Sequence, residues 1–311
     1  MKKKQIGIAL GSGSARGWAH IGVLRALNEM GIYPDIVCGC SAGALIGGAY
    51  AAGYLDELEA WSRTVTRKNV ISFFDLSLMS GGVIAGDRMM AFFREQIGDV
   101  EIESLPLSFA AVATDLATGR EVWLRTGRLA EAVRASISLP GVFTPLRRDD
   151  RWLVDGGIVN PVPVSICKAM GADVVIAVNL NGSIVGRHLP KESKRPVKAK
   201  TAATAGHFSS LITRGLKNGM DSVLAQVWRG GRGTPGLFDV MASSINIMQD
   251  RITRGRMASD PPDIMLTPRL EHLGLLEFYR ADDAIEEGRR CTLRVREALA
   301  PLAAEKKPLY S

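Results

Sequence analysis

A serine flanked by small residues, Gly39-Cys40-Ser41-Ala42-Gly43, matches the G-x-S-x-G pattern of nucleophile elbows. An apolar segment precedes the pattern, and a helix rich in small residues is expected to follow it. In such an elbow a sharp turn projects the hydroxyl outward at a helix N-terminus, where the helix dipole stabilises negative charge. Small side chains at Gly39 and Gly43 let the strand and helix backbones cross closely. The pattern therefore indicates Ser41 as a nucleophile for acyl transfer.

A second glycine-rich segment, Gly11 to Gly17, joins an expected strand to an expected helix. A dinucleotide fingerprint G-x-G-x-x-G that starts at Gly11 would need glycine at position 16, where the chain has Arg16. Unpaired amides at a helix N-terminus bind an oxyanion as well as a phosphate. Because the candidate nucleophile follows the very next strand, we interpret this loop as an oxyanion hole.

A serine nucleophile needs a base, and the residues leave two candidates open. His20 lies one turn into the helix after the loop, a position more typical of a packed histidine. Asp155 ends an apolar strand just before Gly156-Gly157, where its side chain can enter a cleft or simply form an Asp-Gly turn. An aspartate serves as a base if it bonds the serine hydroxyl directly in a partly desolvated pocket, because burial raises its proton affinity.

Strands that alternate with helices must position these residues. The apolar segments predict strands over Gln5–Leu10, Ile36–Cys38, Phe109–Thr114, Glu121–Leu124, Trp152–Val154, Val174–Leu180 and Ile264–Leu266. Helices are predicted over 18–30, 42–54, 56–67, 87–97, 129–137, 162–170 and 281–303. The alternation predicts an α/β fold in which helices cover both faces of the sheet.

An apolar stripe predicts one further helix. Its residues recur at helical spacing and are Phe238, Met241, Ile245, Met248 and Ile252. A stripe of this kind is typical of a core or packing face and not of a catalytic one.

The composition of the 311 residues, 46% of them hydrophobic, predicts a globular chain with a sizeable core. Apolar runs are too short for a membrane span, so we expect a cytoplasmic protein. Residues 182–234 hold ten lysines and arginines against two acidic residues, so the net charge of +7 is concentrated there. We interpret this segment as a flexible basic insertion, with peripheral contact to an anionic inner membrane surface as the alternative. No aromatic interleaving accompanies the charge, which argues against a nucleic-acid partner.

The four cysteines do not predict a disulfide framework or a metal centre. They are scattered, and no histidine stands near them at a metal-ligand spacing; they are Cys38, Cys40, Cys167 and Cys291. We expect reduced thiols packed as small hydrophobic side chains.

Three strings in order, Ile8–Leu24, Gly39–Gly43 and Val154–Gly157, together resemble the signatures of the patatin-like phospholipases. The resemblance is closest to the bacterial neuropathy-target-esterase subgroup. Four further strings support it: Val112–Leu116, Thr118–Glu121, Ala135–Gly141 and Asp260–Ile264. The similarity runs through nearly the whole chain except the basic insertion.

The resemblance implies a lipid-ester hydrolase with a Ser-Asp dyad, in which Ser41 is the nucleophile and Asp155 the base. It implies oxyanion amides at Gly13 and Ser14, with Arg16 supporting the loop or the anionic substrate, and no metal or organic cofactor. The family loop commonly reads G-G-G-x-R-G, whereas this chain has serine at positions 12 and 14. Backbone amides survive that change, but a positive φ there is unfavourable for serine.

The resemblance also implies a three-layer α/β/α sandwich with a mostly parallel sheet. We expect the patatin-like catalytic core over 6–168 and a C-terminal part, 169–311, that completes the sheet and carries the insertion 182–234. An apolar segment over 71–79 is predicted to belong either to a lid or acyl channel or to the ordinary core. A regulatory or lipid-binding protein with little turnover remains the alternative function, and the sequence does not give the oligomeric state.

Overall fold

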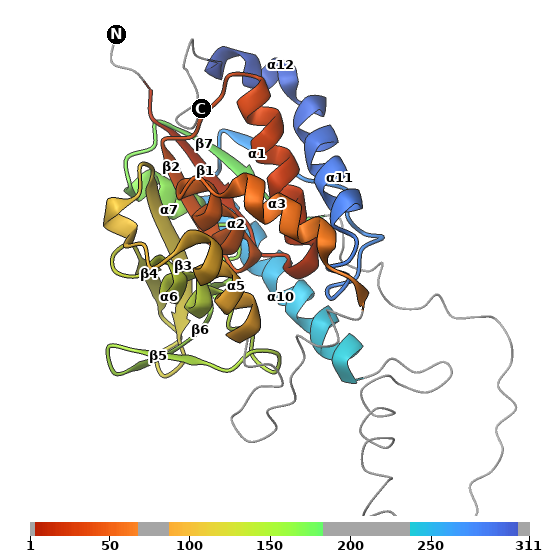
Figure 1. Ribbon diagram of the computed structural model, residues 1–311. Coiled ribbons are helices and arrows are strands. Elements are labelled where there is room, and N and C mark those ends of the chain that lie inside the picture. The colour runs from red at the N-terminus through yellow and green to blue at the C-terminus, as the bar shows by residue number, and fades with distance from the viewer. Residues whose placement is uncertain (1–3, 68–86, 183–236, 304–311) are drawn as a thin grey trace, which may run out of the picture. The chain divides into compact units, whose positions relative to one another are not determined.

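The computed structural model describes residues 4–67, 87–182 and 237–303 (Figure 1). The chain divides into two compact units, residues 1–184 with 248–311, and residues 185–247. Only 237–247 of the second unit are described. The predicted lid segment 71–79 and all but the first residue of the basic insertion 182–234 lie outside the described residues.

One eight-stranded sheet runs through the first unit, in the order β5-β6-β3-β2-β1-β7-β8, with β4 paired to β3. The strands are β1 (Ile6–Leu10), β2 (Ile36–Cys40), β3 (Ser108–Asp115), β4 (Glu121–Leu124), β5 (Leu146–Arg148), β6 (Arg151–Asp155), β7 (Val174–Val178) and β8 (Ile264–Leu266). The pairs among β1, β2, β3, β7 and β8 are parallel, and β4, β5 and β6 pair antiparallel. The predicted mostly parallel α/β sheet is confirmed.

Every predicted strand is present to within two residues at either end. One strand, β5, was not predicted, because its three residues include two arginines and have no apolar pattern of their own. It forms as the partner of β6 in a hairpin whose turn residues, Asp149 and Asp150, have φ of 48° and 60°. Backbone pairing with β6 forms this strand, and the strand propensity of its own residues does not.

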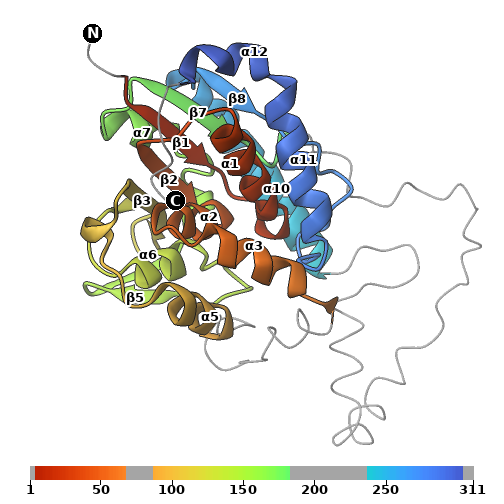
Figure 2. The ribbon, with the colours of Figure 1, turned by 45° about the horizontal axis from the view of Figure 1, so that its top comes forward.

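Helices cover both faces of the sheet (Figures 1 and 2). The α-helices are α1 (Ala19–Glu29), α2 (Ala42–Ala51), α3 (Leu55–Thr64), α5 (Asp87–Ile97), α6 (Leu129–Ser136), α7 (Val164–Ala169), α10 (Leu237–Ser259), α11 (Ala281–Arg294) and α12 (Arg296–Leu299). Short 3-10 turns are η1 (Ser14–Trp18), η2 (Ile102–Ser104), η3 (Gly156–Ile158) and η4 (Ala300–Leu302). The predicted closing helix 281–303 is wrong as a single helix, because it is broken into α11, α12 and η4.

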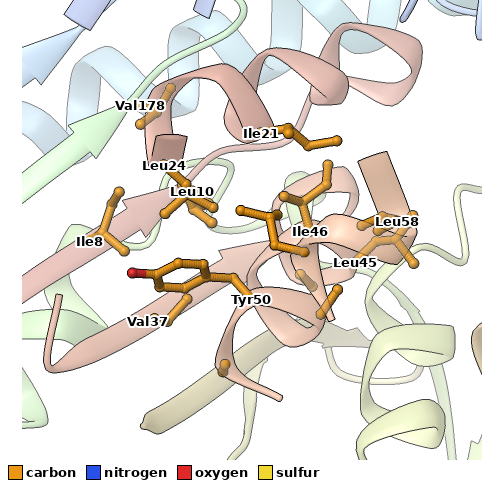
Figure 3. Close-up of a cluster of buried hydrophobic side chains, with 14 of the residues drawn as sticks. Ile8, Leu10, Ile21, Leu24, Val37, Leu45, Ile46, Tyr50, Leu58 and Val178 are labelled. Carbon is orange, nitrogen blue, oxygen red and sulfur yellow. The ribbon is translucent and has the colours of Figure 1, made fainter. Parts of the chain in front are cut away.

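Side chains that alternate along the strands divide between two hydrophobic clusters. On β1, Ile8 and Leu10 join the cluster with α1, α2, α3, α6 and α11, while Ala9 joins the one with α7. Figure 3 shows part of the first cluster, where Tyr50 of α2 and Ile21 of α1 lie over the strands. Since both faces of the central strands are buried, these strands are apolar throughout.

Helix α10 departs from the face predicted for it. Met248 of the predicted apolar stripe is 51% exposed, whereas Gln249, Asp250 and Thr253 are buried. The expectation of an apolar packing face is therefore wrong for this part of the helix. The physical reason lies in what α10 covers. Gln249 donates a hydrogen bond to the Ser12 hydroxyl of the glycine-rich loop and accepts one from the Asn181 side chain, and an apolar side chain could make neither.

Candidate active site

The elbow around Ser41 lies where β2 leaves the sheet and α2 begins. Ser41 has φ 55° and ψ −120°, a conformation that residues other than glycine rarely adopt. Crowding requires glycine on both sides of it. A Cβ on Gly39 would lie 2.4 Å from the carbonyl oxygen of Gly43, and one on Gly43 would lie 2.0 Å from that of Leu10. The G-x-S-x-G spacing lets strand and helix turn this tightly.

The register of β3 brings Asp155 to Ser41. Val112 of β3 pairs with Cys40, the last residue of β2. The next residue of β3, Ala113, pairs with Asp155. Because Ser41 directly follows Cys40, the two side chains meet at the end of β2. The Ser41 hydroxyl donates to Asp155 Oδ2 at 2.5 Å, across 114 positions of the sequence.

The carboxyl group of Asp155 is fully buried. Its second oxygen, Oδ1, accepts a hydrogen bond from the Gly157 amide at 2.7 Å. Burial raises the pKa of Asp155 from 3.8 to about 6, against the opposing effect of the hydrogen bonds from Ser41 and Gly157. The carboxylate is therefore still ionised at neutral pH, and it binds a proton more tightly than an exposed aspartate does.

The glycine-rich loop leaves the sheet beside the elbow. Leu10, the last residue of β1, pairs with Gly39 of β2, so loop and elbow start at the same edge. A Cβ built on Gly17 would lie 2.4 Å from the Cβ of Ala42, so the far end of the loop packs on the start of α2. The carboxyl ends of neighbouring parallel strands are the usual place for a ligand site in such sheets.

Most backbone amides of this loop are already bonded. Those of Gly11, Ser12 and Ala15 donate to carbonyl groups of other segments at 2.8–3.1 Å. Among the described residues, the amides of Gly13 and Ser14 donate to no acceptor. The positive φ considered for positions 12 and 14 occurs at Ser14, with φ 53°, and not at Ser12. These two adjacent N–H groups therefore have no hydrogen-bond partner within the described part of the chain.

Arg16 supports this loop from inside the protein. Its side chain is fully buried, and its Nε donates to the Gly13 carbonyl at 3.2 Å. Burial lowers the pKa of Arg16 to about 9, so the guanidinium stays charged at neutral pH. The resemblance implies that Arg16 supports either the loop or an anionic substrate, and the hydrogen bond to Gly13 is a direct contact with the loop.

His20 is bonded to the loop and not to Ser41. Its Nε2 lies 2.7 Å from the carbonyl oxygen of Gly11, and the ring is fully buried. Burial lowers the pKa of His20 to about 4, so the ring is neutral and Nε2 carries the proton that this carbonyl accepts. The hydroxyl of Ser41 is bonded instead to Asp155.

Three residues for which the sequence indicates no role bond to the backbones of Ser41 and Asp155. Ser136 Oγ accepts a hydrogen bond from the Ser41 amide at 2.9 Å. The carbonyl of Ser138 accepts from the Asp155 amide at 2.9 Å, and the Thr114 hydroxyl donates to the Asp155 carbonyl at 2.9 Å. The strings that contain these residues resembled the family, but nothing in their local pattern indicated these contacts.

A buried polar network behind the loop was also missed. Gln249 Nε2 donates to Ser12 Oγ at 3.1 Å, and Asn181 Nδ2 donates to Gln249 Oε1 at 2.8 Å. A Cβ built on Gly157 would lie within 3.1 Å of Ser12 Oγ, Gln249 Nε2 and Asp155 Oδ1. Ser12, one of the two serines that depart from the family loop, is therefore bonded to α10 close to Asp155.

Other ionisable groups give no second centre in the described part of the chain. All four cysteines are free and buried. No three histidine, cysteine, aspartate or glutamate side chains of the described residues gather as metal ligands would. Of the helices described, none combines the length and apolarity of a membrane span.

Comparisons with known proteins point to one family. The sequence profile described as patatin-like phospholipase matches residues 8–168. An uncharacterized NTE family protein of Mycobacterium tuberculosis is 34% identical over 333 residues, which cover 94% of this chain and 92% of that protein. The lysophospholipase nte1 of Emericella nidulans is 31% identical over 294 residues, 92% of this chain but 18% of that protein.

Among solved structures, VipD from Legionella pneumophila is similar with a TM-score of 0.46 and 14% identity, over 96% of this chain and 67% of that one. The profile covers the strand, loop and elbow that carry Ser41 as well as the strand that carries Asp155. The chain therefore belongs to the patatin-like phospholipase family, a family of carboxylic ester hydrolases.

Proposed function

We propose that this protein hydrolyses acyl esters of phospholipids or lysophospholipids, with Ser41 as the nucleophile and Asp155 as the base. The single observation that carries the proposal is the 2.5 Å hydrogen bond from the Ser41 hydroxyl to the buried Asp155 carboxylate. The strained backbone of Ser41 and the unbonded amides of Gly13 and Ser14 are further support.

In the first half of the reaction, Ser41 Oγ attacks the ester carbonyl carbon while its proton passes to Asp155 Oδ2. The carbonyl oxygen becomes an oxyanion, and the amides of Gly13 and Ser14 donate to it. When the tetrahedral intermediate collapses, the bond to the leaving alkoxide breaks. Asp155 returns the proton to that oxygen, so the alcohol leaves and an acyl-serine remains.

In the second half, a water molecule takes the place of the alcohol. Asp155 accepts one proton from it as its oxygen attacks the acyl carbon, and the same amides hold the new oxyanion. Collapse then breaks the bond to Ser41 Oγ, which recovers the proton from Asp155. The products are a free fatty acid and the restored dyad, and the protons balance over the cycle.

The substrate class follows from the family and from one relative. The fungal relative is named a lysophospholipase, and this chain is similar to it over 294 residues. A phospholipid or lysophospholipid with one accessible acyl ester is therefore the proposed substrate. The test is an ester panel assayed with the wild type and with Ser41→Ala as the blank.

Covalent labelling separates the proposed nucleophile from other serines. A fluorophosphonate probe is expected to label the wild type and to leave Ser41→Ala unlabelled. Asp155→Asn should lower the labelling rate by about 10²–10⁴-fold, because the hydroxyl loses its proton acceptor. Labelling of Ser41→Ala would refute the proposed nucleophile, and an inert wild type would favour the regulatory or lipid-binding alternative.

A histidine variant tests the rival base. His20→Gln keeps a donor that can reach the Gly11 carbonyl, since only Nε2 of His20 is bonded there. We expect this variant to lose at most a few-fold of the hydrolysis rate. A loss as large as that of Asp155→Asn would restore His20 as a candidate for the base.

A further inference from the structure

The C-terminal end of α6 contacts both members of the proposed dyad. The Ser136 hydroxyl accepts from the Ser41 amide at 2.9 Å. Two residues later, the carbonyl of Ser138 accepts from the Asp155 amide, also at 2.9 Å. One short turn thus bonds to the backbones of two residues that stand 114 positions apart.

This turn is itself firmly held. Ser136 and Ser138 are fully buried. Arg134 NH1 donates to the Ser138 hydroxyl at 2.6 Å, and its NH2 donates to the Thr144 hydroxyl at 2.8 Å. A buried turn that is bonded on several sides has little freedom to shift, so it is suited to fixing the groups that bond to it.

The Ser41 amide needs such a partner for a physical reason. At the N-cap of α2 its N–H has no acceptor within the helix, and the Ser41 side chain is nearly buried. Its φ of 55° is a strained value that persists only when the surroundings enforce it. Ser136 Oγ supplies both the missing acceptor and one of the enforcing contacts.

We propose that Ser136 is a positioning residue of the active site. Its hydroxyl oxygen holds the amide of Ser41 and thereby fixes the backbone that aims Ser41 Oγ at Asp155. The inference rests on the proposed function of Ser41 and Asp155, and it adds a residue that acts on the reaction only through Ser41. A small displacement of a nucleophile can cost up to about a hundredfold in rate, which gives such a contact its weight.

Two substitutions separate the hydrogen bond from packing. Ser136→Ala removes the acceptor and leaves a small void. Ser136→Cys leaves no void but replaces the oxygen by a larger sulfur, which is a weak acceptor. Ser62→Ala is the matched control, because Ser62 is also buried but its hydroxyl donates to the Glu59 carbonyl on α3.

The experiment measures the maximal inactivation rate with a fluorophosphonate probe, and kcat and KM with a soluble short-chain ester. Thermal unfolding of each variant reports the folded fraction. For Ser136→Ala and Ser136→Cys we expect kcat and the inactivation rate to fall about tenfold, with KM within about twofold of the wild type. Any shift of the acidic limb of the pH profile should be upward, because a weaker hydrogen bond from Ser41 stabilises the Asp155 carboxylate less.

A merely structural role would lower the unfolding temperature and leave the rates of the folded protein alone. Wild-type rates in Ser136→Cys would therefore overturn the inference, and so would a rise in KM at constant kcat. If Ser136→Ala fails to fold, the cysteine variant still carries the comparison. An inert wild type would refute the proposed function itself, which is distinguishable from a reactive wild type with unaffected Ser136 variants.

Discussion

At the scale of single residues, the site combines a strained serine with a buried carboxylate. Ser41 has a positive φ, which costs about 1–3 kcal/mol and must be offset by the surrounding structure. Asp155 has no exposed surface, and burial raises its pKa to about 6. The positive φ of Ser41 and the burial of the Asp155 carboxylate each lower the stability of the fold. Together they bring the Ser41 hydroxyl into contact with the Asp155 carboxylate.

The pKa of Asp155 predicts the pH dependence of hydrolysis. The proposed base must be ionised to accept the proton of Ser41, and Asp155 has a pKa of about 6. We expect kcat/KM to be half-maximal near pH 6, to fall about tenfold per pH unit well below it, and to reach a plateau above about pH 7. Rates of a neutral soluble ester between pH 4 and 9 measure this, and a midpoint near pH 4 would contradict the buried carboxylate as the base.

Replacing Asp155 by asparagine is predicted to remove activity and to raise the free energy of unfolding. Asp155 binds its proton more tightly in the folded chain, so this stabilisation is complete below pH 3.8 and is lost as the pH rises through about 6. Asp155→Asn stays neutral at every pH. Its free energy of unfolding should therefore exceed that of the wild type by up to about 3 kcal/mol above pH 6.

Urea unfolding at pH 7.5 and at pH 4 measures this difference. The advantage of Asp155→Asn should shrink at the lower pH, where the wild-type carboxyl is largely protonated in the folded chain. A variant that is less stable than the wild type at both pH values would show that burial of the charge costs little.

At the scale of elements, the site is an outcome of strand register. Strand β3 pairs with β2 up to Val112 and with β6 from Ala113 on, so the ends of β2 and β6 meet. A slip of β6 by one residue would turn Asp155 to the other face of the sheet. Helix α10 adds a polar side chain, Gln249, to the back of the loop that leaves β1.

This arrangement predicts that a charge on α10 changes the pKa of Asp155, the proposed base. Gln249 Nε2 and Asp155 Oδ1 are neighbours, because a Cβ built on Gly157 would lie within 3 Å of each of these two atoms. A carboxylate in place of that amide would raise the pKa of Asp155, so Gln249→Glu should move the acidic limb of the pH profile upward by about one pH unit.

Met248→Glu is the control for this test. It adds the same charge one residue away on α10, where the side chain is 51% exposed, and solvent should screen it. Equal profiles for both variants and the wild type would show that Gln249 does not act on Asp155.

At the scale of the whole molecule, the two clusters on either side of the sheet support these contacts. Strand residues alternate between them, so the sheet is buried on both faces in the first unit. The four cysteines lie within this interior and form no disulfide. They therefore report on the integrity of the core.

We predict that the native protein resists thiol modification. Burial raises the pKa of Cys38, Cys40 and Cys291, which disfavours the reactive thiolate. An aromatic disulfide reagent at pH 8 should modify none of the four cysteines within minutes and all four in guanidinium chloride. Rapid modification of a native thiol would indicate local opening of the core.

Several features of this protein followed from short-range patterns. The buried strands β1, β2 and β7 are continuous apolar runs, and helices between them carry apolar residues at helical spacing, so element order and sheet type were predictable. The elbow at Ser41 was predictable because crowding by neighbouring backbone demands glycine at 39 and 43. The resemblance to the family rested on the same local strings.

Only the tertiary structure decided which groups meet. The sequence left both His20 and Asp155 as candidate bases, because neither local pattern gives the distance from the side chain to Ser41. In the structure, the pairing of β3 with β6 brings Asp155 to Ser41, whereas His20 bonds to Gly11. The packing of α6 brought Ser136 to Ser41. The polar side of α10 turned inward because the loop beneath it offers hydrogen bonds. Local sequence fixes periodicity and backbone preference, whereas contacts between distant segments depend on register and packing.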